Sequence, residues 1–227
     1  MNSLATNLQS VRATINAAAA RAGRDPSEVT LIAVSKTREP SEIAAAAAAG
    51  ATEFGENYVQ ELLAKQKELD GIHWHFIGHL QRNKVRFILP FCAMIHVVDS
   101  VRLAQEIDHR AKQLDRVQPV LLQVDLAGEE TKFGCPEDLV EELAQELANL
   151  PNVDWQGLMT IPPLAGNSEQ SRPYFIRLRE LRDKLRERFP DQPLAHLSMG
   201  MSMDYEVAIE EGATLVRIGT AIFGPRH

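Results

Sequence analysis

The sequence predicts an α/β fold, a single (β/α)8 barrel of the TIM type with an extra amino-terminal helix. Three observations lead to this fold class. Short apolar runs alternate along the chain with segments of helical periodicity, and the alternation occurs eight times. The 227 residues suffice for one such barrel. No linker or change of composition divides them, so residues 1–227 are expected to form one domain.

The elements follow in order from the extra helix. Leu8, Val11 and Ile15 recur at helical spacing before a stop at Gly23, and the first strand is the apolar run 29–35. Further strands are expected at 52–54, 73–77, 93–98, 119–125, 153–159, 194–198 and 214–218, and helices at 40–49, 57–69, 81–88, 100–114, 136–149, 169–189 and 203–211. Strand-helix alternation implies a parallel sheet, and eight units imply closure.

Composition and charge restrict the function classes. The formal net charge of −7 argues against a nucleic-acid partner, and the basic segment Arg172–Arg188 alternates with acidic residues as a solvated helix face does. The two cysteines provide no disulfide framework. Neither a secretory signal nor an apolar run of about 18 residues is visible. We therefore expect a cytoplasmic monomer without a membrane contact.

Lys36 is the first candidate site residue. It lies at the carboxyl end of the first strand, just before Pro40, and strand carboxyl ends face the active site in a barrel of this kind. An exposed surface lysine is the alternative. Because the preceding run is apolar, desolvation would favour the neutral amine, which is the form that makes imines.

Two turns behind the last two strands form a candidate phosphate cradle. Ser198 and Gly200 belong to one turn, and Gly219 and Thr220 belong to the other. Glycines allow close approach of backbone N–H groups, and this part of a barrel often binds phosphate. Ordinary turn chemistry is the alternative. A phosphate cradle opposite a strand-end lysine is the arrangement expected for pyridoxal 5'-phosphate held as a Schiff base.

Several short motifs strengthen this interpretation. They are Ala33–Thr37 (AVSKT), Phe54–Glu61 (FGENYVQE), Trp74–Gln81 (WHFIGHLQ) and Gly157–Met159 (GLM). Together with the two turns they resemble the pyridoxal phosphate homeostasis protein family, whose barrel is similar to the amino-terminal domain of alanine racemases. The resemblance implies a covalent imine between Lys36 and pyridoxal 5'-phosphate. It also implies storage, buffering or delivery of the cofactor, with apo forms of pyridoxal phosphate enzymes as recipients and no substantial catalysis.

Two further residues are candidates for contacts to the cofactor ring. By similarity to the alanine racemases, Arg217 is expected to face the pyridine nitrogen, and the alternative is a salt bridge to a carboxylate on a neighbouring strand. Asn57 follows the second strand and could donate to the phenolate oxygen of the cofactor. An N-cap role in the next helix is the alternative for Asn57.

Other chemical groups are weaker candidates. His73, His75 and His79 have no acidic or cysteine ligand at helpful spacing, so we expect hydrogen bonding and no metal site. Gly78 suggests close packing against a flat ligand. Lys132 matches a family lysine and is either a second aldehyde-reactive group or a solvated side chain.

A small racemase or lyase is the alternative function. Such an enzyme needs an acid or base on each face of the substrate, and alanine racemases take one of them, a tyrosine, from a second domain. The three tyrosines, Tyr58, Tyr174 and Tyr205, all fall in predicted helices, and we predict no catalytic residue. A third possibility is a barrel that binds another phosphate ester and leaves Lys36 unmodified.

Overall fold

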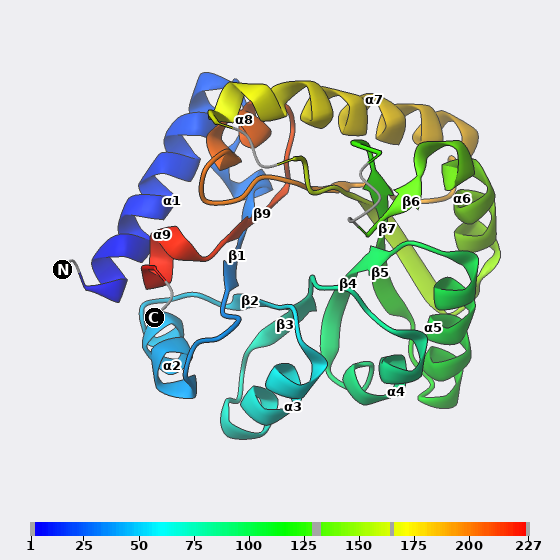
Figure 1. Ribbon diagram of the computed structural model, residues 1–227, viewed down its shortest axis with the longest axis horizontal. Coiled ribbons are helices and arrows are strands. Elements are labelled where there is room, and N and C mark those ends of the chain that lie inside the picture. Colours follow the sequence, from blue (N-terminus) through cyan, green and yellow to red (C-terminus); the bar gives the residue numbers. More distant parts are fainter. Residues whose placement is uncertain (1–2, 129–132, 164–165, 226–227) are drawn as a thin grey trace.

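The protein folds as a closed barrel of eight parallel strands with helices around it, as predicted (Figure 1). The computed structural model describes residues 3–128, 133–163 and 166–225. The barrel strands are β1 (Thr30–Val34), β2 (Glu53–Glu56), β3 (His73–Phe76), β4 (Cys92–Val98), β5 (Gln118–Asp125), β7 (Val153–Met159), β8 (His196–Ser198) and β9 (Leu215–Ile218). Strands β1 and β9 pair, and the pairing of β4 with β5 closes the ring.

The helices cover the outside of the ring. They are α1 (Leu4–Arg21), α2 (Pro40–Ala48), α3 (Val59–Glu68), α4 (Val85–Ile88), α5 (Val101–Gln113), α6 (Val140–Asn149), α7 (Arg172–Arg188), α8 (Tyr205–Glu210) and α9 (Thr220–Phe223). The extra helix α1 buries Leu8, Val11 and Ile15 and packs against α8 and α9 (Figure 1). It therefore supports the last two helical segments, which follow β8 and β9.

The structure differs from the predicted elements at several ends. A short strand, β6 (Cys135–Pro136), pairs with the carboxyl end of β5 where the sequence predicted the start of a helix. The predicted helix at 81–88 is a 3-10 turn at Arg82–Lys84 followed by α4. The predicted helix at 169–189 begins as a 3-10 turn at Ser168–Ser171, before α7, which has proline in its first turn.

The prediction that Tyr58 lies in a helix was wrong. Strand β2 runs on to Glu56, so the chain needs extended residues to leave the barrel end before it can turn. Tyr58 is the N-cap of α3, with φ −123° and ψ 125°, and its side chain is 54% exposed. Tyr174 and Tyr205 lie in α7 and α8, as expected.

The arginines of α7 form ion pairs that extend to neighbouring elements. Arg172 pairs with Glu169, Glu210 and Glu211, and Arg179 also pairs with Glu211. The basic segment therefore fastens α7 to α8 and is neutralised by carboxylates of this chain. No helix in the described part of the chain is long and apolar enough to cross a membrane.

Candidate functional site

A cavity of about 350 Å³ lies at the carboxyl end of the barrel. This volume falls in the range of roughly 300–1,000 Å³ that is typical of small-molecule sites. Five of the predicted site residues line it, namely Lys36, Asn57, Arg217, Gly219 and Thr220. The other lining residues are Val34, Ile77, Ile161, Pro163, Asn167, Ser168, Ser171, Met201, Ser202, Met203 and Asp204. The cavity thus brings together residues at the ends of β1 and β9 and in the loops after β2 and β8.

The pairing of the first and last strands brings the lysine to the glycine turn. Ala33 of β1 is in register with Ile218 of β9. Just beyond this pair, a Cβ added at Gly219 would lie 3.3 Å from the Val34 carbonyl oxygen. Glycine thus allows the two chain segments to approach closely, and Lys36 enters the cavity beside the Gly219 turn.

The backbone on both sides of Lys36 is held by a buried cluster. The Lys65 ammonium donates to the Ser35 carbonyl at 2.8 Å, to Glu56 Oε1 at 2.8 Å and to Glu61 Oε2 at 2.9 Å. The Thr37 amide donates to the same Glu61 oxygen at 2.8 Å. Lys65 is 5% exposed. A buried lysine was not predicted here, and the signal that could have indicated it is the Glu61–Lys65 spacing of an i,i+4 pair.

The cluster shifts the pKa values of its two carboxyl groups and holds Thr37 at a positive φ. Burial raises the pKa of Glu56, against the opposing effect of its hydrogen bonds from Lys65 and Ser35. For Glu61, burial alone would raise the pKa, but hydrogen bonds from Thr37 and Lys65 outweigh it and the pKa is lowered. Thr37 has a φ of 63°, which is unusual for a β-branched residue. The surrounding bonds therefore hold the chain after Lys36 in a strained conformation.

Arg217 is buried and donates to neutral acceptors. Its Nη1 donates to Ser198 Oγ at 2.6 Å and its Nη2 donates to the Thr160 carbonyl at 2.9 Å. Burial lowers its pKa to about 10, and the charge of Asp204 acts in the opposite direction. Arg217 therefore stays cationic at neutral pH. The alternative salt bridge is not observed, since residues 3–128, 133–163 and 166–225 supply no carboxylate within ion-pair distance of Arg217.

Asn57 is not a helix cap, because Tyr58 occupies the N-cap position of α3. Its Oδ1 atom is buried and has no hydrogen-bond partner among the described residues. A buried acceptor without a partner costs about 1–3 kcal/mol, so the atom is suited to a ligand donor. Gly78 packs closely as expected, but its partner is the backbone of Asn57, whose carbonyl oxygen would lie 2.2 Å from an added Cβ.

Two predicted cradle residues lie outside the set that lines the cavity. The Ser198 hydroxyl is completely buried and bonds Arg217 and His96 Nδ1, the latter at 2.9 Å. Gly200 has a φ of 91°, and an added Cβ would lie 2.6 Å from Ala208 Cβ of α8. Ser198 therefore supports Arg217, and Gly200 allows α8 to pack.

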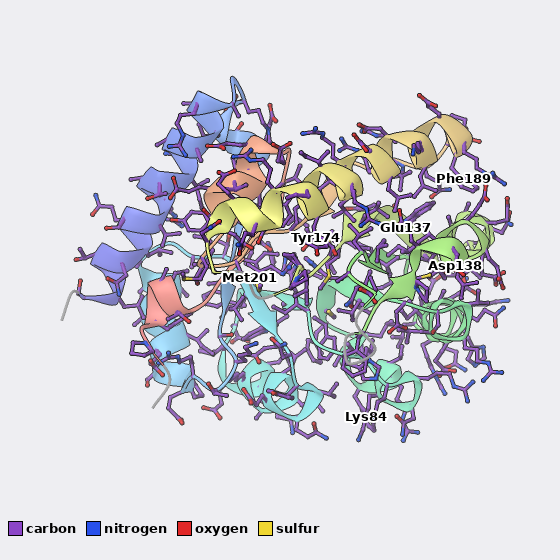
Figure 2. All side chains as sticks on the ribbon, turned by 45° about the horizontal axis from the view of Figure 1, so that its top comes forward. Lys84, Glu137, Asp138, Tyr174, Phe189 and Met201 are labelled. Atoms are coloured by element: carbon purple, nitrogen blue, oxygen red, sulfur yellow. The ribbon has the colours of Figure 1, made fainter. Side chains whose placement is uncertain are left out.

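Ser202 and Asp204 were not predicted as site residues. Both line the cavity, and Ser202 Oγ accepts from the Ala221 amide at 3.4 Å. Asp204 Oδ1 accepts from the Met201 amide at 2.7 Å. Met201, labelled in Figure 2, lies in the segment between β8 and α8. Ser202 and Asp204 carry a hydroxyl and a carboxylate just before helix α8, and this sequence feature could have indicated them.

The histidines of β3 and of the following loop have hydrogen-bonding or stacking partners. His73 Nδ1 and His75 Nε2 both bond Glu53, at 2.7 and 2.8 Å. The His79 ring stacks on Phe133 with centroids 3.8 Å apart. Within the described ranges, no group of three or more histidine, cysteine, aspartate or glutamate side chains is arranged to hold a metal. Lys132 lies outside the described residues.

A second cavity of about 480 Å³ adjoins the first and shares Asn57, Ile77 and Ile161 with it. Besides apolar and amide side chains it is lined by Tyr58, His79 and Lys84, the last of which Figure 2 labels. Because the smaller cavity contains Lys36, Arg217 and the glycine turn, we take it as the candidate site.

Comparison with known proteins places the chain in a family. Residues 6–227 match the family model described as alanine racemase, N-terminal domain. The chain is 49% identical over 215 residues to the pyridoxal phosphate homeostasis protein of Aquifex aeolicus, with 93% of each chain covered. It is 46% identical to that of Pseudomonas aeruginosa, with 100% of this chain and 97% of the relative covered.

Solved structures agree with these relatives. PipY of Synechococcus elongatus, whose structure has pyridoxal phosphate bound, is 40% identical with a TM-score of 0.86, and 98% of this chain and 100% of that chain are covered. An alanine racemase of Clostridium difficile shares the fold, with a TM-score of 0.71 at 16% identity over 97% of this chain and 57% of that chain. The chain belongs to the pyridoxal phosphate homeostasis protein family, which is built on the barrel of the alanine racemase amino-terminal domain.

Proposed function

We propose that this protein binds pyridoxal 5'-phosphate and stores, buffers or delivers it within the cell. One observation carries the proposal. The strand-end amine of Lys36, the Gly219 turn, the cation of Arg217 and the unpartnered Asn57 oxygen all line one cavity. This donor and acceptor set fits a ligand that combines an aldehyde, an anionic phosphate and an aromatic ring with polar substituents.

Each lining residue has a proposed task. Lys36 forms a covalent imine with the aldehyde, because bound pyridoxal phosphate supplies a carbonyl that condenses with amines. Thr220 and Ser202 offer hydroxyl groups to the phosphate at the Gly219 turn. The Asn57 carboxamide can both accept and donate beside the ring hydroxyl.

Ser198 and Gly200 were predicted to contact the cofactor, and we propose that both act one layer behind it. Ser198 holds Arg217, whose remaining N–H groups are available to the ring nitrogen. Gly200 keeps α8 close to the barrel, so that the loop containing Ser202 borders the cavity.

The same site is poorly equipped for carbanion chemistry. A cationic guanidinium at the ring nitrogen favours its unprotonated form and weakens the electron sink. Alanine racemases share that arginine, so a second factor is needed. The described residues that line the cavity include neither histidine nor tyrosine, and Tyr58 and His79 line the adjoining cavity. Loss of one positioned acid-base group typically costs a factor of about 10²–10⁴ in rate.

Borohydride reduction and peptide mapping test the attachment. Reduced protein should carry a pyridoxyl adduct on the peptide that contains Lys36, and the Lys36→Arg variant should lose it. An adduct mainly on Lys132 would overturn the assignment. An unchanged visible absorption spectrum after addition of pyridoxal phosphate would instead favour the barrel that binds another phosphate ester.

A deuterium experiment separates cofactor carrier from racemase or lyase. The loaded protein, incubated with alanine in deuterated water, should show negligible exchange of the α-proton. Rapid incorporation of deuterium into alanine would establish the racemase. Transfer to an apo form of a pyridoxal phosphate enzyme, followed by its recovered activity, tests the proposed recipients.

A further inference from the structure

A continuous row of hydrogen bonds crosses the interior of the barrel beneath the cavity. Its four bonds are Glu53 Oε2 to His75 Nε2 at 2.8 Å, His75 Nδ1 to His96 Nε2 at 2.9 Å, His96 Nδ1 to Ser198 Oγ at 2.9 Å and Ser198 Oγ to Arg217 Nη1 at 2.6 Å. The exposed His73 bonds the other Glu53 oxygen from outside this row, at 2.7 Å. The bonds are all short, and each connects to the next through a single side chain. We call this row the interior chain.

The interior chain runs from one end of the barrel to the other. Glu53 is the first residue of β2, at the amino-terminal end of the ring, whereas Arg217 reaches the cavity at the carboxyl end. The bond between His96 of β4 and Ser198 of β8 joins strands that are not neighbours in the ring, so it passes through the interior. His75 is 5% exposed, and His96 and Ser198 are fully buried.

Both ends of the interior chain impose the same direction of proton donation. Arginine can only donate, so Ser198 Oγ accepts from Arg217. At the other end, hydrogen bonds from His75 and His73 outweigh the effect of burial and lower the pKa of Glu53 to about 2, so its carboxylate can only accept.

The two ends do not by themselves fix the middle of the chain, because a serine oxygen can accept two hydrogen bonds. His75 donates from Nε2 to Glu53, and its Nδ1 faces His96 Nε2. Burial keeps the pKa of His96 well below its ordinary value, so this ring is neutral and has one donor and one acceptor nitrogen. With its proton on Nε2, His96 accepts from the Ser198 hydroxyl at Nδ1, and the dipoles from Arg217 to Glu53 align.

We propose that His96 and His75 are positioning residues that lock the Ser198 hydroxyl as an acceptor for Arg217 and connect this cation to the Glu53 carboxylate. The guanidinium is thereby held in one orientation, with its unused N–H groups directed to a ligand ring that presents an acceptor. The inference deepens the proposed function, because it makes the interior chain the source of preference for an unprotonated pyridine nitrogen.

Nitrogen NMR of the ¹⁵N-histidine-labelled protein tests the direction without any ligand. Both His75 and His96 should be neutral and carry their proton on Nε2. A proton on His96 Nδ1, or a doubly protonated His75, would overturn the proposal, since the Ser198 hydroxyl would no longer be locked as described.

Ligand binding tests the consequence. Pyridoxal 5'-phosphate is compared with an analogue in which a C–H group replaces the ring nitrogen. His96→Leu should weaken binding of pyridoxal phosphate about tenfold, the effect of one lost charge-assisted contact, and leave the analogue unchanged. His96→Gln, which keeps one donor and one acceptor, should restore the preference. His196→Leu, a change on β8 outside the interior chain, is the matched control.

The outcomes separate this inference from the proposed function. If the unaltered protein fails to bind pyridoxal phosphate, the proposed function is wrong, whereas the NMR result still decides the direction of the interior chain. If binding occurs but His96→Leu weakens both ligands equally, the positioning role is wrong. Should His96→Leu fail to fold, His96→Gln and the NMR measurement still decide.

Discussion

The backbone around Lys36 is fixed more tightly than a strand end requires. Its neighbours are held by Lys65 and Glu61, which together satisfy the Ser35 carbonyl and the Thr37 amide. A lysine that must meet an aldehyde in one orientation benefits from such support, because correct positioning lowers the entropic barrier to bond formation.

Removal of the Lys65 ammonium should therefore affect both stability and binding. Lys65→Met leaves Glu56 buried without its cation, and such a loss costs roughly 3–5 kcal/mol of unfolding free energy. Urea unfolding measures the loss, and Lys67→Met, an exposed position on the same helix, is the control. Equal stability of the two variants would contradict the role assigned to the cluster.

Thr220→Val should weaken the hold on the phosphate group. The hydroxyl lines the cavity at the Gly219 turn, and loss of one hydrogen bond to a charged group costs about 1.5–3 kcal/mol. Equilibrium dialysis should show at least a tenfold weaker affinity for pyridoxal 5'-phosphate. Pyridoxal without the phosphate should bind both proteins equally, and a matching loss for pyridoxal would place Thr220 elsewhere in the site.

At the residue scale, the sequence predicted side chains that line the cavity, such as Lys36 and Arg217, better than the side chains behind them. Lys36 was predicted because an apolar run and the following Pro40 fix where it emerges, whereas Arg217 was predicted by similarity to the alanine racemases. Ser198 and Ser202 could not be told apart, because β8 has only three residues, too few to show which side chains point inward. Cross-barrel partners such as His96 are also invisible in a linear pattern.

At the element scale, strand-helix alternation predicted the ring, but short segments escaped it. Tyr58 was wrongly placed in a helix because β2 continues two residues beyond the predicted strand 52–54, so the following helix begins later than predicted. Strand β6 has two residues and α9 has four, lengths at which periodicity carries no signal. Tertiary contacts, and not local propensity, decide such segments.

The loop between β8 and α8 depends on the absence of a side chain at Gly200. Gly200→Ala combines a positive φ with a collision against α8, and we expect it to lower the unfolding free energy by about 2–4 kcal/mol. Gly71→Ala is the control, because Gly71 has a φ of 73° with open space around it. Urea unfolding should show a clearly larger loss for Gly200→Ala, and equal losses would mean that α8 does not pack as described.

For the whole molecule, the barrel is observed, whereas the single domain over residues 1–227, the monomer and the cytoplasmic location stay predictions. None of these follows from strand order. Association and location depend on surfaces and partners that a periodic pattern does not encode.

The buried interior also predicts how the stability of the molecule depends on pH. Burial lowers the pKa of His96, so the unfolded chain binds this proton more readily than the native protein does. This histidine therefore leaves the free energy of unfolding unchanged above about pH 6.5. Below that pH it lowers the free energy of unfolding, by about 1.4 kcal/mol per pH unit for one proton.

Unfolding in urea at pH 7.5, 6.5 and 5.5 measures this slope. His96→Gln should flatten the pH dependence, whereas His109→Gln, on an exposed face of α5, should preserve it. Parallel curves for His96→Gln and the unaltered protein would show that His96 does not titrate on unfolding.

The interior chain also bears on how the sheet finds its alignment. It ties β2, β3, β4, β8 and β9 through four hydrogen bonds, each of which joins side chains of two different strands. In a strand, a slip of one residue turns every side chain to the opposite face. A slipped β3 or β4 would leave a carboxylate or an imidazole unpaired in an apolar layer, which is strongly unfavourable. A purely apolar interior would distinguish poorly between the correct register and a shifted one. The interior chain favours the correct register, because its polar groups are paired in that register alone.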